Sequence, residues 1–503
     1  MGIVFRQSAK NAIVTATGAV LGALIMALSV KFIARQHYGF IGNFTNYAVT
    51  ISQLMLFGIN YTLVVYIHRY NHDERKRRAL LTWSFLLPGV LAVIGAVVYL
   101  SLRTWILNHF QPADQPLMDR YFIWLPVFTV MFIYLMLFES YLGTQMKVAV
   151  AAFMREVVLR VVNIALILLF AFGYVNFDVL VIGTVLIYVV PVVILALLAM
   201  RTDNFRFSLR LSDLSRAEYN DLLKFTWYHF LLTASVNLIA SLDAMLLPLY
   251  DHKGFEVVAV FRVAVFLISF LQIPTKAMTT ASFTVLAKAF AENDHIKAAD
   301  LFVRSSINIF IATVAVALVL CCNLPGLVAV VGKGYADVAP VFLILFAGQL
   351  VNIATGMNDQ VLSITNYYKF NFYLSLILMA TLFLLIRFLV PQFGIFGAAW
   401  STTITIVVFN AAKCWFVWKK LDMLPFSGRT LRVVAAALPA LAGGLLLPHF
   451  FSQVRHIYIN TALDAGLRSF VIVVIYLLML LWLKPSKDLE EYLITIRKNK
   501  RLF

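Results

Sequence analysis

Long apolar runs recur along this chain, and short polar segments separate them. Each run is long enough to cross a bilayer as a helix, which takes about 20 residues. Because the connections are short, no stretch could form a separate soluble domain. The pattern predicts an all-α, polytopic membrane protein with about fourteen transmembrane helices. The predicted helices begin near Asn11, Phe44, Leu80, Tyr121, Val150, Val179, Phe225, Phe255, Phe302, Val338, Phe370, Ile395, Leu431 and Ala465.

The composition supports a membrane protein. Of the 503 residues, 62% are hydrophobic and 13% are charged, and the mean hydropathy is +0.88. A soluble protein could not bury so much apolar surface. The net charge of +17 would suggest nucleic-acid binding in a soluble chain, but here it fits basic loops on one side of a membrane, so we expect no nucleic acid. Cys321, Cys322 and Cys414 lie in apolar runs without the spacing of a disulfide framework or a metal site.

The distribution of Lys and Arg predicts the orientation. Basic loops follow the second, sixth and twelfth predicted helices, around residues 69–78, 201–216 and 419–432. With both termini in the cytoplasm, about 31 of the 41 Lys and Arg residues face that side, as the positive-inside rule requires. The first apolar run, 11–34, lacks a cleavage pattern and is expected to be retained. Residues 484–503 are expected to form a basic, amphipathic cytoplasmic tail.

A weak internal repeat relates the two halves of the chain at an offset of roughly 220 residues. Each copy would hold six helices, and an even number keeps both copies in one orientation, related by an axis along the membrane normal. We therefore predict an N-terminal six-helix lobe (1–200), a cytoplasmic linker (201–224), a C-terminal six-helix lobe (225–420) and two added helices with a basic tail (421–503). The matched positions are Gly39-Phe40 with Gly254-Phe255, Thr144-Gln145 with Thr365-Asn366, and Gly173 with Gly394.

The stretch 225–276 predicts two spanning helices joined by a short polar turn. Asp243 lies deep in the first helix and Arg262 lies in the second. Ionisable groups at such depth are costly unless they face a bundle interior or a wet cavity. Arg262, Ser269 and Lys276 are seven residues apart, which would place them on one helical face over about 21 Å. We expect Arg262 and Lys276 to contact an anionic substrate. Asp243 either pairs with Arg262, binds a proton or Na⁺, or tunes the cavity.

Other cations could also meet an anionic ligand. In the fifth helix, Glu156 and Arg160 are spaced to pair. Arg155 has no such partner on its own face, and its fork would suit phosphate oxygens if it is not an interfacial anchor. Lys31 and Arg35 lie one turn apart at the outer end of the first helix, where they either extend to the interface or meet a phosphate.

Two carboxylates are candidates for ion coupling or charge balance, with interfacial positions as the alternative. Glu139 and Asp359 lie near the cytoplasmic ends of the fourth and tenth helices. Arg387 and Lys413 lie near helix ends and are expected to extend to the interface. The sequence contains no nucleotide-binding G-x-x-x-x-G-K-[ST] loop, no H-E-x-x-H cluster and no Ser-His-Asp constellation, so we expect no cofactor, no metal and no catalytic residue.

Several stretches carry a resemblance to a known family. They are Leu242-Asp243, followed by the turn at Gly254 and a helix with a base inside it; Gly356-Met357-Asn358-Asp359 with Ile364-Thr365-Asn366; and Pro391 to Ala399, which is similar to a P-x-x-G-I-x-G-A-A pattern. The chain resembles the polysaccharide transporters, or O-antigen (Wzx-type) flippases, of the multidrug/oligosaccharidyl-lipid/polysaccharide exporter superfamily.

The resemblance implies two six-helix lobes around a central cavity. It also implies a function: undecaprenyl-pyrophosphate-linked oligosaccharides would cross the bacterial inner membrane by alternating access, with membrane lipids and a proton or Na⁺ as partners. Fixed cations would offset the desolvation of the pyrophosphate. The alternatives are a multidrug or lipid II exporter, or a membrane-bound glycan polymerase or ligase. The candidate headgroup contacts are Arg155, Arg160, Arg262, Lys276, Lys31 and Arg35.

Overall fold

The computed structural model describes residues 3–70, 72–145, 147–202, 205–208, 214–292, 294–365, 367–448 and 457–491. These residues are almost entirely helical, and no β-strand occurs among them. The predicted all-α membrane fold is therefore confirmed. Most of the predicted tail, from residue 492 onward, and residues 449–456 before the last helix lie outside the described residues.

The chain divides into two compact units, Met1–Ala259 and Val260–Phe503. The predicted boundaries of lobes and linker stay a prediction. The helices of the first unit are α1 (Ile3–Phe32), α2 (Arg35–Leu56), α3 (Ile59–Arg69), α4 (Glu74–Ser101), α5 (Arg103–Leu107), α6 (Gln115–Arg120), α7 (Trp124–Thr144), α8 (Val148–Phe153), the π-helix η1 (Met154–Val158), α9 (Leu159–Ala171), α10 (Phe177–Leu186), α11 (Val189–Met200) and α12 (Arg216–Tyr250).

One helix, α13 (Phe255–Ser269), begins in the first unit and ends in the second. It follows α12 after a four-residue turn, as the sequence predicted for this helix pair. The remaining elements of the second unit are α14 (Gln272–Ala291), α15 (His295–Val331), the 3-10 turn η3 (Lys333–Tyr335), α16 (Val338–Ala354), α17 (Asn358–Ile364), α18 (Tyr368–Phe393), α19 (Ile395–Leu421), α20 (Gly428–Leu446) and α21 (Ile457–Leu483).

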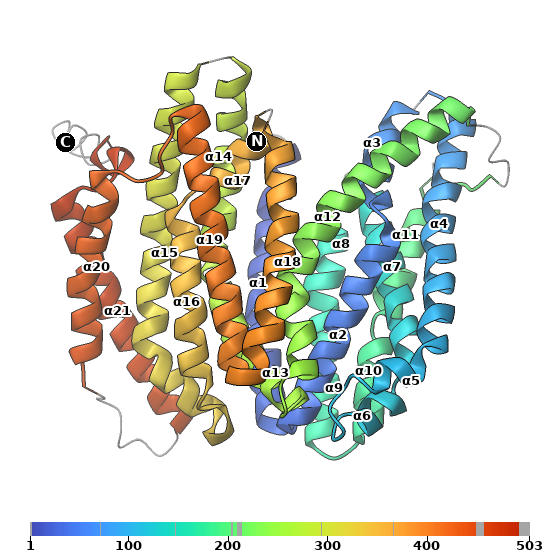
Figure 1. The fold of residues 1–503 in the computed structure, drawn as a ribbon, viewed down its shortest axis with the longest axis horizontal. Helices are drawn as coiled ribbons and strands as arrows, with labels where there is room; N and C mark the ends of the chain where they lie inside the picture. The colour runs from blue at the N-terminus through green and yellow to red at the C-terminus, as the bar shows by residue number, and fades with distance from the viewer. Residues whose placement is uncertain are drawn as a thin grey trace. The chain divides into compact units, whose positions relative to one another are not determined.

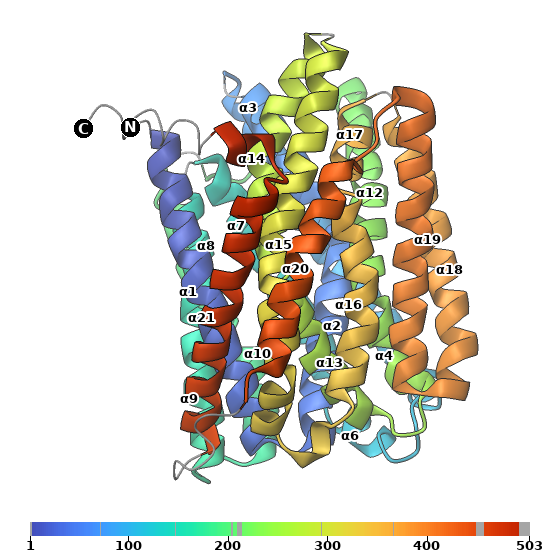
Figure 2. The same cartoon turned by 90° about the vertical axis from the view of Figure 1, so that its left-hand side faces the viewer.

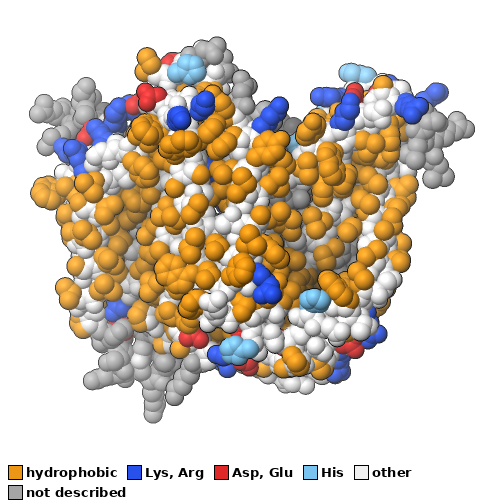
Figure 3. All heavy atoms as spheres, viewed as in Figure 1, with side chains coloured by type: hydrophobic (Ala, Val, Ile, Leu, Met, Phe, Trp, Pro, Cys, Tyr) orange, Lys and Arg blue, Asp and Glu red, His pale blue; other side chains and the backbone are white. Residues whose placement is uncertain are grey.

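The number of spanning segments agrees with the apolar runs of the sequence. Among the described residues, nine helices are long and apolar enough to cross a membrane, or up to twelve if each of three bent helix pairs is one span. Two further segments carry charged residues but reach spanning length: α12, with 35 residues, and the continuous run of α8, η1 and α9. These two bring the total to the predicted fourteen. In the view of Figure 3, hydrophobic side chains cover most of the middle of each unit, and charged side chains gather mainly toward its ends.

In the first unit, α7 is the central helix, and α2, α3, α4 and α11 pack against it, as Figure 1 shows. Its buried side chains include Ile133 and Leu137, which lie one helical turn apart. Lipid tails are as apolar as these side chains, so close packing and polar contacts between helices must add to stability. Two hydroxyl pairs supply such contacts: the buried pair of Thr62 with Thr226 at 2.8 Å, and the partly buried pair of Tyr141 with Thr202 at 2.7 Å.

Three of the spanning segments are bent helix pairs. α2 and α3 meet at 42°, α13 and α14 at 43°, and α16 and α17 at 47°. Phe57 and Gly58 both have positive φ angles between α2 and α3. Pro274 lies near the start of α14 and has no amide hydrogen to donate to the carbonyl four residues earlier. The missing hydrogen bond explains why α13 ends before α14 begins. The second spanning segment of each predicted repeat is thus bent by nearly the same angle, which supports the repeat.

The second unit contains α20 and α21 as an adjacent pair, and both pack on α15, as Figure 2 shows. Polar side chains join α21 to α15 inside the apolar region. Arg468 of α21 is buried and donates to the carbonyl of Cys322 at 3.1 Å, and Asn323 donates to the hydroxyl of Ser469 at 3.1 Å. Such bonds satisfy polar groups that hydrocarbon cannot, so they fix the added helix pair on the rest of the unit.

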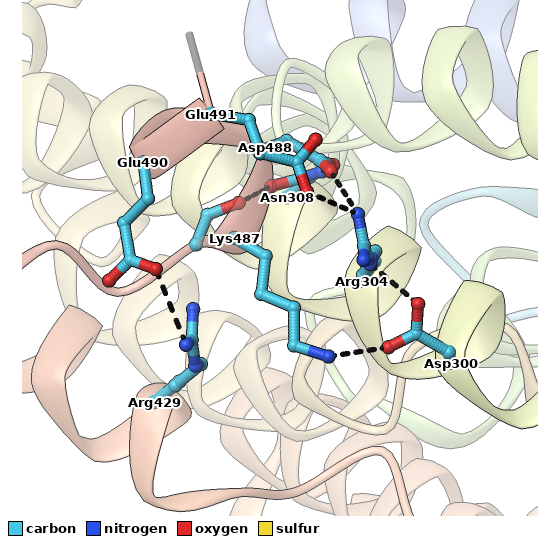
Figure 4. Close-up of polar contacts among 9 residues, drawn as sticks. Asp300, Arg304, Asn308, Arg429, Lys487, Asp488, Glu490 and Glu491 are labelled. Atoms are coloured by element: carbon cyan, nitrogen blue, oxygen red, sulfur yellow. Dashed lines mark hydrogen bonds and ion pairs between the residues drawn. The ribbon is translucent and has the colours of Figure 1, made fainter. Parts of the chain in front are cut away.

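The segment that follows α21 folds back on the start of α15. Figure 4 shows Arg304 of α15 between Asp300, Asp488 and Glu491, at 2.7, 3.2 and 3.2 Å from the nearest carboxylate oxygen of each. Lys487 is 2.7 Å from Asp300 on its other side. A second pair joins the segment to the start of α20 through Glu490 and Arg429, at 3.5 Å. We call residues 486–491 and these partners the carboxyl-terminal clamp.

Candidate functional site

The first unit contains a cluster of four charged side chains from neighbouring helical segments. Glu139 comes from α7, Arg155 and Glu156 from η1, and Arg160 from the first turn of α9. η1 is a π-helix, in which one extra residue widens the turn, and such turns occur frequently at functional sites. The wider turn brings three of the charged residues from a six-residue stretch into one cluster. We call these four residues the Arg155 cluster.

The ion pairs of the cluster form a continuous chain. Arg155 Nη1 lies 2.8 Å from Glu139 Oε2, and its Nε lies 3.2 Å from Glu156 Oε1. The other oxygen of Glu156 is 2.6 Å from Arg160 Nη2, which confirms the pair predicted from the spacing. Arg160 also donates to the backbone carbonyl of Gly18 on α1. Two arginines therefore join three spanning segments: α1, α7 and the continuous run of α8, η1 and α9.

Exposure distinguishes the cations from the acids in this cluster. The Arg155 side chain is 50% exposed, whereas Glu139 is 16% exposed and Glu156 is 17% exposed. The second oxygen of Glu139 is buried and has no hydrogen-bond partner in the part of the chain that the structure describes. Two cations and two acids make the cluster neutral, which limits the cost of burying charge. The exposed part of the cluster is positive, and an anionic group could approach Arg155 from that side.

Gly18 allows α1 to approach the cluster closely. A Cβ at this position would lie 2.7 Å from Glu156 Oε2, so any side chain would displace the carboxylate that holds both arginines. The sequence identified Arg155, Arg160 and Glu139 as candidates but not that they meet. Glu156 was predicted only as a pairing partner. Its role at the centre of the cluster depends on η1, and nothing in the local sequence predicts a π-helix.

A second charged pair lies in the second unit, where Asp359 of α17 meets Lys413 of α19. The Lys413 side chain is only 5% exposed, and its Nζ lies 3.8 Å from the centre of the Phe409 ring. The prediction that Lys413 extends to the interface is therefore wrong, because α17 places a carboxylate against it. Nearby, the hydroxyl of Thr355 donates to Asn410 at 3.1 Å. Asp359 thus forms an ion pair with a buried ammonium.

The helix that was predicted to carry Arg262, Ser269 and Lys276 is not straight. Ser269 ends α13, and Lys276 lies in α14 beyond the 43° bend. A polar stripe along these residues stays a prediction. Arg262 is half-buried and Lys276 is exposed. Asp243 is buried in α12 and belongs to the first unit; its pairing with Arg262 stays a prediction.

Lys31 and Arg35 lie at the junction of α1 and α2. Lys31 is in the last turn of α1, and its Nζ is 5.2 Å from the centre of the Phe32 ring. Arg35 begins α2 and lies 3.8 Å from Glu256, the second residue of α13. Arg35 therefore contacts a carboxylate in this structure. Within the described residues, no group of His, Cys, Asp and Glu side chains has the arrangement of a metal site.

Comparison with known proteins identifies the fold. No protein-family model matches the sequence, and no curated protein sequence matches it. Solved structures do match. The lipid II flippase MurJ in an inward closed conformation has a TM-score of 0.71 at 13% identity, over 93% of this chain and 97% of that one.

Two multidrug transporters match as well. An inward-facing multidrug resistance MATE family transporter of the MOP superfamily has a TM-score of 0.66 at 15% identity, over 80% of this chain and 94% of that one. The MATE multidrug transporter DinF-BH in complex with R6G has a TM-score of 0.57 at 16% identity, over 83% and 95%. This chain therefore has the helical fold that these transporters share.

Proposed function

We propose that this protein is a membrane transporter that moves a lipid-linked anionic headgroup across a bilayer, and that Arg155 contacts the headgroup. The observation that carries the proposal is the half-exposed guanidinium of Arg155, held by two mostly buried carboxylates. An anion on the exposed side could bind the remaining guanidinium hydrogens while both ion pairs persist. The fold shared with transporters supports transport rather than glycan polymerisation or ligation.

The substrate that the sequence favours is an undecaprenyl-pyrophosphate-linked oligosaccharide for surface polysaccharide, moved outward across the bacterial inner membrane. Its pyrophosphate is costly to take out of water, and fixed cations would offset that cost. Lipid II is the second candidate, since one solved structure with this fold is a lipid II flippase. Arg160, Arg262, Lys276, Lys31 and Arg35 remain proposed as further headgroup contacts.

Three acids remain proposed for ion coupling or charge balance, with a proton or Na⁺ as the ion. Glu139 and Asp359 each pair with a cation, which supports charge balance for both. Asp243 is the acid best suited to ion coupling, because it is buried in a long spanning helix. Asp243→Asn is expected to impair export at normal membrane abundance, and unaltered export would remove Asp243 from the mechanism.

Substitution of Arg155 tests the function. Arg155→Gln should lower export roughly ten- to hundredfold, because a charged hydrogen-bond donor to the headgroup is lost. Arg155→Lys should retain part of the activity, since it keeps the charge but loses the planar fork. Export is measured as surface glycan in a flippase-deficient strain, at matched membrane abundance. The control is Arg120→Gln, which removes an exposed arginine whose partner is Asp178.

A double variant separates substrate contact from a structural ion pair. Arg155→Gln alone leaves Glu139 without its cation, so it could lower abundance through the fold. Arg155→Gln with Glu139→Gln restores neutrality and should restore abundance. If Arg155 contacts the headgroup, the double variant is present in the membrane but inactive. Recovery of export in the double variant would contradict the proposal. In a separate test, rescue by the wild-type protein of a strain depleted of its lipid II flippase would favour lipid II as the substrate.

A further inference from the structure

The amino end of α13 is held against the first unit by one buried carboxylate. Asp114 lies in the loop between α5 and α6, outside the spanning helices, and is 1% exposed. Its Oδ2 accepts a hydrogen bond from the backbone amide of Phe255, the first residue of α13, at 2.8 Å. Its Oδ1 accepts from Gln36 Nε2 of α2, also at 2.8 Å. Asp114 thus joins the start of α2 to the start of α13.

The surfaces around Asp114 fit closely. A Cβ on Gly39 of α2 would lie 1.8 Å from the carbonyl oxygen of Phe255, and a Cβ on Gly254 would lie 1.7 Å from Asp114 Oδ2. The Phe255 ring is fully buried and contacts Phe40 at 5.4 Å and Phe110 at 5.7 Å between ring centres. Both glycines therefore permit a contact that any larger residue would prevent. We call it the α2–α13 contact.

The charge of Asp114 is poorly compensated. Its two partners are an amide side chain and a backbone amide, both neutral, and no ion pair to Asp114 occurs among the residues described here. Burial raises the pKa of Asp114, and the charge of Glu256 raises it further, although the hydrogen bonds from Gln36 and Phe255 oppose the shift. Arg35, the cation at this end of α2, contacts Glu256 instead. Tyr47 on α2 also interacts electrostatically with Asp114, and Asp251, His252 and Lys253 lie in the turn before Gly254, whose backbone lies against Asp114.

We propose that Asp114 fixes the amino end of α13 on α2, and that this contact forms with proton uptake by Asp114 and opens with proton release. A carboxyl that loses water when the contact forms holds its proton more tightly in the closed state than in the open one. Low pH therefore favours the closed contact, and this stabilisation is lost as pH rises through the raised pKa of the closed state.

The test is hydrogen–deuterium exchange of the peptide that covers residues 251–260, in the full-length detergent-solubilised protein without substrate. Exchange rates are divided by those of the unstructured peptide, so that the intrinsic effect of pH cancels. In the wild type, protection should fall as pH rises through the raised pKa of Asp114 in the closed contact. Asp114→Asn cannot ionise and should show the same protection at every pH. Asp114→Ala removes both acceptors and should speed exchange about tenfold.

Controls make the result specific. Asp119→Asn changes an acid of α6 that lies 2.7 Å from Arg103 and is partly exposed; it should keep the pH dependence of the wild type. The peptide at the start of α20, which is capped by the neighbouring Ser427, should not respond to pH in any variant. Protection that does not change with pH in the wild type, or an unchanged slope in Asp114→Asn, would overturn the proposal. Neither outcome bears on Arg155 or on the substrate.

Discussion

At the residue scale, charged side chains in this protein are stabilised by partners that the linear sequence does not reveal. The pair of Glu156 and Arg160 could be predicted because helical geometry fixes the distance between positions four residues apart. The partner of Arg155 could not, since Glu139 lies on a different helix. Lys413 was misplaced for the same reason: its burial follows from the position of α17. Sequence reasoning therefore identified the charged residues but not which of them pair across different helices.

The pair of Asp359 and Lys413 leads to a prediction about stability. Asp359→Asn leaves a buried ammonium without its counter-charge, which should destabilise the protein by about 3–5 kcal/mol. Asp359→Asn combined with Lys413→Met removes both charges and should recover much of that loss. The measurement is the thermal unfolding midpoint in detergent. Glu292→Gln is the control, because its partners Lys288 and Lys297 are exposed and such pairs contribute less than about 1 kcal/mol. A double variant no more stable than Asp359→Asn would contradict the prediction.

At the scale of elements, apolar periodicity predicted the helices, but not where they bend. The bend between α2 and α3 follows two residues with positive φ, and Pro274 marks the break before α14. Sequence reasoning continued the Arg262 face straight to Lys276. The bend places Lys276 on a helix with a different axis from that of Arg262, which the spacing of the residues does not reveal. The sequence contains no signal for the π-helix η1. Contacts with other helices stabilise its extra residue, and no residue type marks such a turn.

The carboxyl-terminal clamp gives a prediction for one element. Arg304 contacts three carboxylates, two of which belong to the segment after α21. Arg304→Gln should therefore release that segment and raise its hydrogen exchange by a few-fold, equivalent to about 1 kcal/mol. High salt should have a similar effect on the wild type, since about 1 M salt screens charges beyond roughly 3 Å. Lys288→Gln, at an exposed pair elsewhere in the unit, is the control. Exchange that responds to neither change would show that apolar packing alone holds the segment.

At the scale of the whole molecule, the number of spanning segments was predictable, because bilayer thickness sets the length of every apolar run. The predicted linker at 201–224 stays a prediction, and the first compact unit extends along the chain through α12 to Ala259. The reason is that α12 packs on α2 and α3, and the polar contacts of Tyr47 with the carbonyl of Met245, and of Thr50 with Ser241, join these helices. A hydropathy profile does not reveal contacts of this kind.

The orientation in the membrane is the last prediction. Fourteen spanning segments are an even number, so both termini should lie on one side, and the loops richest in Lys and Arg should lie on that side too. Reporter fusions after Lys420 and after Phe503 should therefore both read cytoplasmic, while a fusion after Arg120, in the segment that follows α4, should read external. The Arg120 fusion is the matched control. It also ends at a basic residue, but that residue is predicted to lie on the other side of the membrane. An external reading at Phe503 with a cytoplasmic reading at Lys420 would mean that α20 and α21 do not both cross. External readings at both, with a cytoplasmic reading at Arg120, would invert the topology and place the amino end of α13 in the cytoplasm.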